Sequence, residues 1–279
     1  MPVVPHAITH RTTTKARAMP PLTPRQVEII EMAKVQGRVD VDDLAAGFKV
    51  TKQTIRRDLN ELCERGVLNR FHGGAVPPSG VINVAYEARR QLAPAEKGAI
   101  GVEAAALVPD GASILINIGT TTEQVAMALR HRQGLMVITN NINVANILQG
   151  YEANQIIVAA GLLRHSDGGI VGEQAVEFIR QFKVDYAIVG ASAIDADGSL
   201  LDYDYREVSV ARAIIECART SVLVADGSKF ERTAPVRIGH LSDLDHFVTD
   251  RSPPADIKRI CKQAKVDIHL PARAEAAVP

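Results

Sequence analysis

From residue 95 onward, short apolar runs alternate with stretches of helical spacing, and this alternation leaves few folds open. One helix is expected near 96–107. The apolar runs of strand length stand at 113–117, 135–139, 155–160, 185–190, 221–225 and 245–249. Apolar strands with intervening helices predict an α/β domain with a largely parallel sheet that is covered on both faces. Ligands of such sheets bind outside the carboxyl ends of the strands.

The first of these strands is followed by Gly119-Thr120-Thr121-Thr122, and a helix is expected from Glu123 onward. A glycine lets a ligand approach the backbone, hydroxyls donate hydrogen bonds, and the free amides at the start of a helix favour an anion. Capping of the helix by one threonine is the simpler alternative. Three consecutive threonines after a glycine favour a phosphate-binding loop instead.

Polar residues also follow two other strands. Asn140 follows the strand at 135–139, and Lys229 lies a few residues beyond the strand at 221–225. Taken singly, the asparagine is more typical of a turn and the lysine of a surface. Because the carboxyl ends of parallel strands meet at one edge of the sheet, we expect these side chains to line the same crevice.

Two segments, 161–172 and 195–207, are expected to be glycine-rich or acidic loops. Carboxylates in the second segment are available to hold sugar hydroxyls or to cap a helix that begins near Tyr205. Capping is the simpler explanation for any one of them. The carboxylates are Asp202, Asp204 and Glu207.

The N-terminal region predicts three short helices. The first ends at Gly37, the second runs through Phe48, and the third covers 52–62. Acidic residues at the start of the second helix suit the helix dipole. Thr51 is placed to cap the third helix, because its hydroxyl can accept an unpaired backbone amide.

The third helix is amphipathic and basic. Ile55, Leu59 and Leu62 fall on one stripe, and polar side chains cover the other face. A helix-turn-helix uses such donors against base edges in the major groove. The alternative is a solvated helix whose arginines pair with acids such as Glu61. The residues expected to contact DNA are Thr51, Lys52, Gln53, Thr54, Arg56, Arg57 and Asn60.

Residues 67–76 predict a strand, a glycine turn and a return strand, which together form a β-wing. Arg70 and His72 lie near its tip, where contact with DNA phosphates is expected. Residues 1–76 carry 12 basic and 8 acidic side chains, whereas the remainder carries 20 and 24. This asymmetry favours a polyanionic partner for the N-terminal part.

Composition and motifs exclude several classes of protein. Three scattered cysteines fit neither a disulfide framework nor a zinc site, and they suggest a reducing cytoplasm. No run reaches the roughly 18 apolar residues of a membrane helix. There is no nucleophile elbow, zinc helix, Walker loop or dinucleotide fingerprint, so no catalytic residue, cofactor or metal is expected.

The chain is expected to divide into four parts. These are a disordered leader over 1–21, a winged helix-turn-helix domain over 22–76, a linker over 77–94 and a sensor domain over 95–279. The leader is basic and rich in threonine, as organelle transit peptides are, but it lacks an amphipathic repeat. Translation starting at Met19 is a further alternative.

Thr-Ile-Arg-Arg-Asp-Leu-Asn-Glu-Leu at 54–62, followed by Arg-Phe-His-Gly-Gly-Ala at 70–75, resembles the winged-helix signature of DeoR-type bacterial repressors. The rest resembles the sugar-phosphate sensor domain of that family, whose fold is shared with ribose-5-phosphate isomerase. The resemblance covers nearly all of 22–270. It implies a homodimeric or homotetrameric repressor that a small phosphorylated metabolite releases from its double-stranded DNA operator.

The resemblance also assigns site residues. Gly119, Thr120, Thr121 and Thr122 fall on the phosphate loop of the family. Asn140, Asp202, Glu207 and Lys229 fall on positions that line its ligand pocket. Asn117 departs from the pattern, because many members have an aspartate there.

Segments 138–146, 167–172, 195–201 and 204–208 most resemble members that respond to sn-glycerol 3-phosphate, which implies that inducer. A response to another sugar or polyol phosphate stays open. A sugar-phosphate isomerase with Glu207 as base and Lys229 as electrostatic partner is the enzymatic alternative, against which the winged helix argues. A third alternative is an activator or an architectural DNA-binding protein whose DNA affinity no ligand changes.

Overall fold

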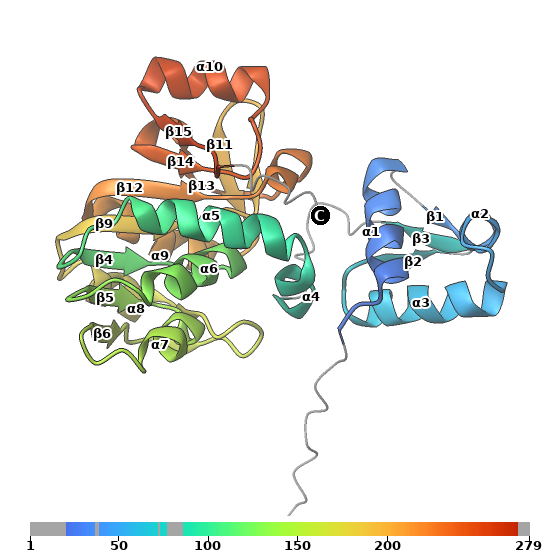
Figure 1. Cartoon of the computed structure of the whole chain (residues 1–279), viewed down its shortest axis with the longest axis horizontal. Coiled ribbons are helices and arrows are strands. Elements are labelled where there is room, and N and C mark those ends of the chain that lie inside the picture. The colour runs from blue at the N-terminus through green and yellow to red at the C-terminus, as the bar shows by residue number, and fades with distance from the viewer. Residues whose placement is uncertain (1–20, 37–38, 72, 77–85, 273–279) are drawn as a thin grey trace, which may run out of the picture.

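The computed structural model describes residues 21–36, 39–71, 73–76 and 86–272. Figure 1 shows a small N-terminal part in blue and cyan and a large mixed part from green to red. Residues 1–20 of the predicted leader and His72 lie outside the described residues. Within the described ranges, no helix combines the length and the apolar character needed to cross a membrane.

The N-terminal part is a winged helix-turn-helix, as predicted. Its elements are α1 (Pro24–Gln36), β1 (Val39–Asp40), α2 (Val41–Gly47), α3 (Lys52–Glu64), β2 (Asn69–Phe71) and β3 (Gly74–Val76). The wing is the hairpin of β2 and β3. β1, which the sequence pattern did not predict, pairs with β3 through Val39 and Ala75, and two residues are too few to show a strand period. The core includes Ile55, Leu59 and Leu62 at 0% exposure.

The large part is built on a seven-stranded sheet in which every pair of neighbours is parallel. The strands are β4 (Ser113–Ile116), β5 (Met136–Thr139), β6 (Gln155–Val158), β9 (Val184–Val189), β12 (Ala218–Val224), β14 (His246–Val248) and β15 (Asp267–His269). Six of these were predicted. The seventh, β15, lies at one edge of the sheet and is partly exposed, which explains its weak apolar signal.

Helices cover both faces of the sheet. Those on one face are α5 (Pro94–Ala106), α6 (Thr120–Leu129) and α7 (Ile142–Leu148), and those on the other are α8 (Glu173–Ile179), α9 (Tyr205–Glu216) and α10 (Ala255–Ala264). Successive strand residues point to opposite faces, so Leu115 joins one hydrophobic cluster and Ile114 the other. The predicted α/β class and two-sided coverage are confirmed.

The segment predicted as a loop at 161–172 contains a β-hairpin, and the one at 195–207 contains the turn and second strand of another, which corrects that prediction. The hairpins are formed by β7 (Leu162–Leu163) with β8 (Ile170–Val171), and by β10 (Ala193–Ile194) with β11 (Ser199–Asp202). Gly168 and Gly198 adopt the positive φ values of the turns, at 72° and 86°. Strands of two to four residues are too short to reveal alternation in the sequence.

Four remaining elements complete the structure. They are β13 (Val236–His240), which pairs with β11, the 3-10 helices η1 (Gly227–Glu231) and η2 (Leu241–Asp243), and α4 (Tyr86–Gln91), which falls in the range expected to be a linker. The strand order is β15-β14-β12-β9-β4-β5-β6. The chain therefore runs outward in both directions from the gap between β4 and β9, and such a switch point is where α/β sheets bind ligands.

Candidate functional site

The first candidate site is the outer face of α3. Thr51 caps this helix as predicted, because its Oγ1 accepts the amide of Thr54 at 3.2 Å. The two hydroxyls lie 2.8 Å apart. The exposed members of the predicted DNA-contacting set are Thr51, Lys52, Gln53, Arg56, Arg57 and Asn60, whereas Thr54 is half-buried.

Two cations on this face form ion pairs with carboxylates of the same domain. Arg57 Nε lies 3.2 Å from Glu61 Oε1, as the alternative interpretation of the helix foresaw. Lys52 Nζ lies 2.9 Å from Asp42 Oδ2 on α2. All four side chains are substantially exposed, so each pair contributes little to stability and breaks at little cost. Both cations can therefore exchange a carboxylate for DNA.

The start of α1 fixes α3 from the side. Arg25 Nε donates to Asp58 Oδ2 at 2.6 Å, and Asp58 is buried. Gln26 Nε2 donates to Glu61 Oε2 at 2.7 Å, and this hydrogen bond lowers the pKa of Glu61. A groove of about 660 Å³ runs along this contact and includes Gln53 and Arg57 in its lining.

The wing contributes one described candidate. Arg70 on β2 is exposed, and its Nη1 donates to the carbonyl oxygen of Gly74 at 3.3 Å across the hairpin turn. The guanidinium therefore lies beside the wing turn, where a phosphate contact was predicted.

The second candidate site lies at the carboxyl ends of the parallel strands. Helix α6 begins at Thr120 rather than at Glu123, so the threonines form its first turn instead of a preceding loop. β-Branched residues are tolerated there because no preceding turn restricts their side chains, and first-turn amides have no intrahelical partner. Gly119 is the N-cap with φ 150° and makes no side-chain cap. The helix terminus thus keeps its amides for an anion.

Thr122 shapes this terminus from the inside. Its Oγ1 lies 2.8 Å from the carbonyl oxygens of both Asn117 and Gly119 and donates to them. Its side chain is fully buried. Thr122 therefore holds the loop, which leaves Thr120 and Thr121 as the threonines of the predicted phosphate contact.

Buried amide oxygens lie at two neighbouring strand ends. Asn140 is at 0% exposure, and its Nδ2 donates to the carbonyl oxygen of Ile170 at 3.1 Å. In the described part of the chain, Asn140 Oδ1 and Asn117 Oδ1 have no hydrogen-bond partner. Buried polar atoms are normally satisfied, so unsatisfied ones mark places suited to a polar ligand.

Lys229 is buried at 9% exposure rather than on the surface, where lysines usually lie. Its Nζ is 4.0 Å from Asp226 Oδ2. Burial lowers the pKa of Lys229 to about 7, and the positive charges of Arg232, Lys97 and Arg89 act in the same direction. Cations gathered around a buried lysine repel one another, and a bound anion would relieve that repulsion.

Arg164 was not predicted as a site residue, yet it joins three carboxylates. Its Nε and Nη2 donate to Asp167 at 2.8 and 2.6 Å, Nη1 donates to Asp204 at 2.9 Å, and Nη2 donates to Glu207 at 2.5 Å. These bonds tie the β7–β8 hairpin to the first turn of α9. No local motif could have revealed them, because Asp204 and Glu207 lie 40 and 43 residues away in the sequence.

The three predicted carboxylates have different roles. Asp204 caps α9 by accepting the amide of Arg206 at 2.9 Å, which supports the capping interpretation for this residue. Asp202 accepts from Ser192 Oγ at 2.9 Å and from the amide of Tyr203 at 2.6 Å. Burial raises the pKa of Glu207 to about 7, and the charge of Asp202 contributes, whereas Arg164 opposes it.

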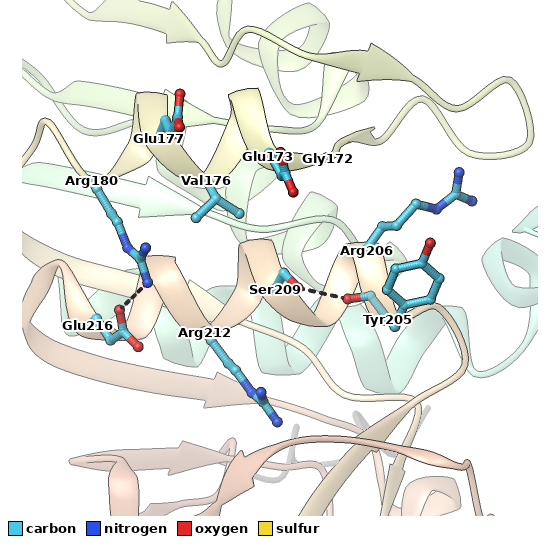
Figure 2. A pocket seen from close by; sticks show the side chains of 10 residues that line it. All are labelled: Gly172, Glu173, Val176, Glu177, Arg180, Tyr205, Arg206, Ser209, Arg212 and Glu216. Carbon is cyan, nitrogen blue, oxygen red and sulfur yellow. Dashed lines mark hydrogen bonds and ion pairs between the residues drawn. The ribbon is translucent and has the colours of Figure 1, made fainter.

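A separate groove of about 680 Å³ lies between α8 and α9, which run side by side in Figure 2. Its walls carry acidic side chains such as Glu173 and basic ones such as Arg212. Tyr205, at 69% exposure, stands at one end. None of the predicted site residues lines this groove.

Comparisons with known proteins match both parts of the chain. The sequence pattern of the DeoR-like helix-turn-helix domain matches residues 25–80, and that of the DeoR C terminal sensor domain matches residues 93–251.

Curated relatives extend over most of the chain. The glycerol-3-phosphate regulon repressor of Haemophilus influenzae is 48% identical over 86% of this chain and 93% of its own length. The repressor of the same name in Escherichia coli is 45% identical over 89% of this chain and 98% of its own length. The repressor CsqR of Escherichia coli is 38% identical over 89% and 95%.

Among solved structures, ribose 5-phosphate isomerase A from Neisseria gonorrhoeae matches 51% of this chain and 54% of its own. The identity is 14% and the TM-score is 0.36. A match of this quality says nothing about ligand or activity.

Proposed function

This chain belongs to the DeoR family of transcriptional repressors, and from that premise we propose that it represses genes of glycerol phosphate use and that sn-glycerol 3-phosphate releases it from its operator. The chain is a DNA-binding regulator rather than an enzyme. The ligand is proposed because relatives at 45 to 48% identity are named for the glycerol-3-phosphate regulon.

One observation supports a phosphorylated ligand above all. The uncapped start of α6 and the buried Lys229 stand at the ends of strands β4 and β12, which flank β9 at the switch point of the sheet. A helix start offers amides and a partial positive charge, and a buried lysine supplies a full one once it is protonated. A phosphate dianion satisfies both.

The remaining site residues are proposed to recognise the polyol part. Asn140 presents an unsatisfied amide oxygen to a hydroxyl donor. Glu207 has a pKa near 7, so it can accept from a hydroxyl or donate to one. Asp202 lies within electrostatic range of Glu207. A small number of placed polar groups of this kind fixes the orientation of a small ligand and provides specificity.

For DNA, we propose that α3 enters the major groove and that the wing contacts phosphates. Arg57 and Gln53 are proposed to reach base edges, and Lys52 and Arg70 the backbone. A homodimer or homotetramer would place two such helices in successive grooves of a palindromic operator. Such a repressor works in the bacterial cytoplasm, associated with the nucleoid when it is bound.

The test is titration of an operator complex. The operator is first selected from genomic fragments with the purified full chain, and sn-glycerol 3-phosphate, glycerol, inorganic phosphate and tetritol and pentitol phosphates are then added at fixed salt. We expect sn-glycerol 3-phosphate to lower operator affinity about 5 to 150-fold, the usual range of such coupling. Release by another phosphate alone would reassign the inducer, and no release by any would overturn the proposal.

A further inference from the structure

Helix α4 follows directly on residues 77–85, which lead from the DNA-binding domain, and it packs against α6, as Figure 1 also shows. Tyr86 begins this helix and is 9% exposed. Its Oη lies 2.7 and 2.8 Å from the two carboxylate oxygens of Glu123, and it accepts from Asn143 Nδ2 at 2.9 Å. Glu123 adjoins Thr122 in the first turn of α6, so α4 is fastened to the proposed phosphate loop.

Arg89 lies one helical turn after Tyr86, on the side of α4 that contacts the sensor domain. Its Nη2 lies 3.7 Å from Asp167 Oδ2, a carboxylate that Arg164 already binds through two nitrogens. Arg89 Nε is buried and has no hydrogen-bond partner among the described residues. The charge of Arg89 acts on both Glu207 and Lys229, two residues of the proposed ligand site. Arg89 is therefore a half-buried cation whose buried Nε is a donor left without a partner among the described residues.

The end of α4 is anchored as well. Lys97 of α5 is 3% exposed, and its Nζ donates to the carbonyl oxygens of Arg89 and Leu92 at 2.5 and 2.6 Å. Leu92 in turn belongs to the hydrophobic cluster of the winged helix, together with residues such as Leu59 and Leu62. The segment 86–92 thus contacts the sensor site at one end and the DNA-binding core at the other.

We propose that Arg89 binds the phosphoryl group of the inducer directly, and that α4 thereby couples occupancy of the sensor site to the DNA-binding domain. This inference rests on the proposed function, because it needs a phosphorylated ligand at the α6 terminus. A guanidinium and a phosphate form charge-assisted, often bidentate hydrogen bonds. Moving Arg89 toward the ligand moves α4, and with it Leu92 and the support that this residue gives to the winged helix.

The experiment compares full-length variants with the wild type. Arg89→Ala removes the proposed contact, Arg89→Lys keeps the charge, and Tyr86→Phe removes the hydroxyl that bonds Glu123 and Asn143. Arg90→Ala is the matched control, because Arg90 is an exposed arginine on the same helix. Calorimetry measures the Kd for sn-glycerol 3-phosphate, and anisotropy measures operator affinity with and without saturating ligand.

For Arg89→Ala, we expect the ligand Kd to rise at least about tenfold, as the loss of hydrogen bonds to a charged group implies. Arg89→Lys should fall between this variant and the wild type. Arg90→Ala and wild type should agree within about twofold. In all of these variants, operator affinity without ligand should stay within about twofold of the wild-type value. That result also shows that the variants are folded.

For Tyr86→Phe, ligand binding should change less than about threefold, while the ratio of operator affinities without and with ligand falls at least about threefold. A purely structural tyrosine would leave that ratio unchanged. If the wild type binds ligand and Arg89→Ala binds it equally well, or Tyr86→Phe keeps the full ratio, this inference is wrong while the proposed function stands. If the wild type binds no phosphorylated polyol, both are wrong.

Discussion

Lys229 Nζ lies 4.0 Å from Asp226 Oδ2 at the carboxyl end of β12, and both side chains are buried. Asp226 supports the charged form of the lysine, and the lysine helps to lower the pKa of Asp226 to about 2 against the effect of burial. The support is incomplete, because burial and the positive charges of Arg232, Lys97 and Arg89 leave Lys229 with a pKa of about 7. The lysine is therefore about half protonated near neutral pH.

Inducer binding should consequently be coupled to proton uptake. A bound phosphate dianion raises the pKa of Lys229 above 7 and raises that of Glu207 as well, so protons enter the site when ligand binds at pH 8. The phosphate itself has lost its second proton by then, because its pKa is about 6. The Kd for sn-glycerol 3-phosphate should rise from pH 7 to pH 9, by up to about tenfold per pH unit for each linked proton.

Calorimetry at pH 8 in buffers of different ionisation enthalpy measures this uptake. Lys229→Met removes one of the two groups, so the variant should bind more weakly and take up fewer protons than the wild type. An observed enthalpy that is independent of the buffer would show that neither side chain changes its protonation when ligand binds.

The three threonines of the α6 start should separate into two classes. Thr122→Val removes the hydroxyl that donates to Asn117 and Gly119, so we expect a loss of about 1 to 3 kcal/mol in the free energy of unfolding. Thr120→Val and Thr121→Val should leave stability nearly unchanged and keep operator binding, but make it insensitive to inducer. Denaturant titration and operator release measure the two effects. A normal response from both latter variants would discredit the assigned loop.

Prediction from sequence succeeded where the signal is local. The β4 run Ser-Ile-Leu-Ile is apolar because both of its faces are covered, and the partly exposed edge strand β6 also keeps an apolar run, Ile-Ile-Val. The anion site that is proposed at Gly119 and the following threonines also comes from a local signal, and the helix start on which it depends is present in the structure. The onset of α6 was placed three residues late, because first-turn residues need no helical hydrogen-bond partner and so follow no periodic rule.

Prediction failed where the contact spans the chain. Arg164 meets Glu207 across 43 residues, and Arg89 acts on a sheet domain from a segment expected to be a linker. Neither residue stands in a motif. The burial of Lys229 was unexpected for the same reason, because it depends on how η1 packs rather than on the residues beside the lysine. Tertiary placement, rather than composition, assembles the cations of this site.

Close packing of α5 on α6 gives a test of the sensor fold with a matched control in one helix. A Cβ at Gly101 would lie 2.6 Å from the backbone carbonyl of Gln124, whereas one at Gly98 would meet nothing within 4 Å. Gly101→Ala should lower the free energy of unfolding by about 1 to 3 kcal/mol through overpacking. Gly98→Ala should raise it by about 0.5 to 1 kcal/mol through helix propensity. Equal effects from the two substitutions would mean that the helices are farther apart.

On the DNA side, the ion pairs of α3 predict different roles for two cations. Arg57 projects from the middle of the exposed face and is held by Glu61, which Gln26 holds in turn. A guanidinium that is oriented by a pair which breaks at little cost is available to a base edge. Arg57→Ala should therefore cost about 1 to 3 kcal/mol on the operator and much less on random DNA, so the ratio of the two affinities falls.

Lys52 stands at the first position of α3 beside Asp42, where a phosphate contact is expected. Lys52→Ala should weaken operator and random DNA alike and reduce the dependence of log affinity on log salt by about one phosphate contact. Anisotropy titrations of both DNAs at several salt concentrations measure both variants. If Arg57→Ala lowers both affinities equally while Lys52→Ala changes their ratio, the lysine reads the base and the arginine binds the backbone.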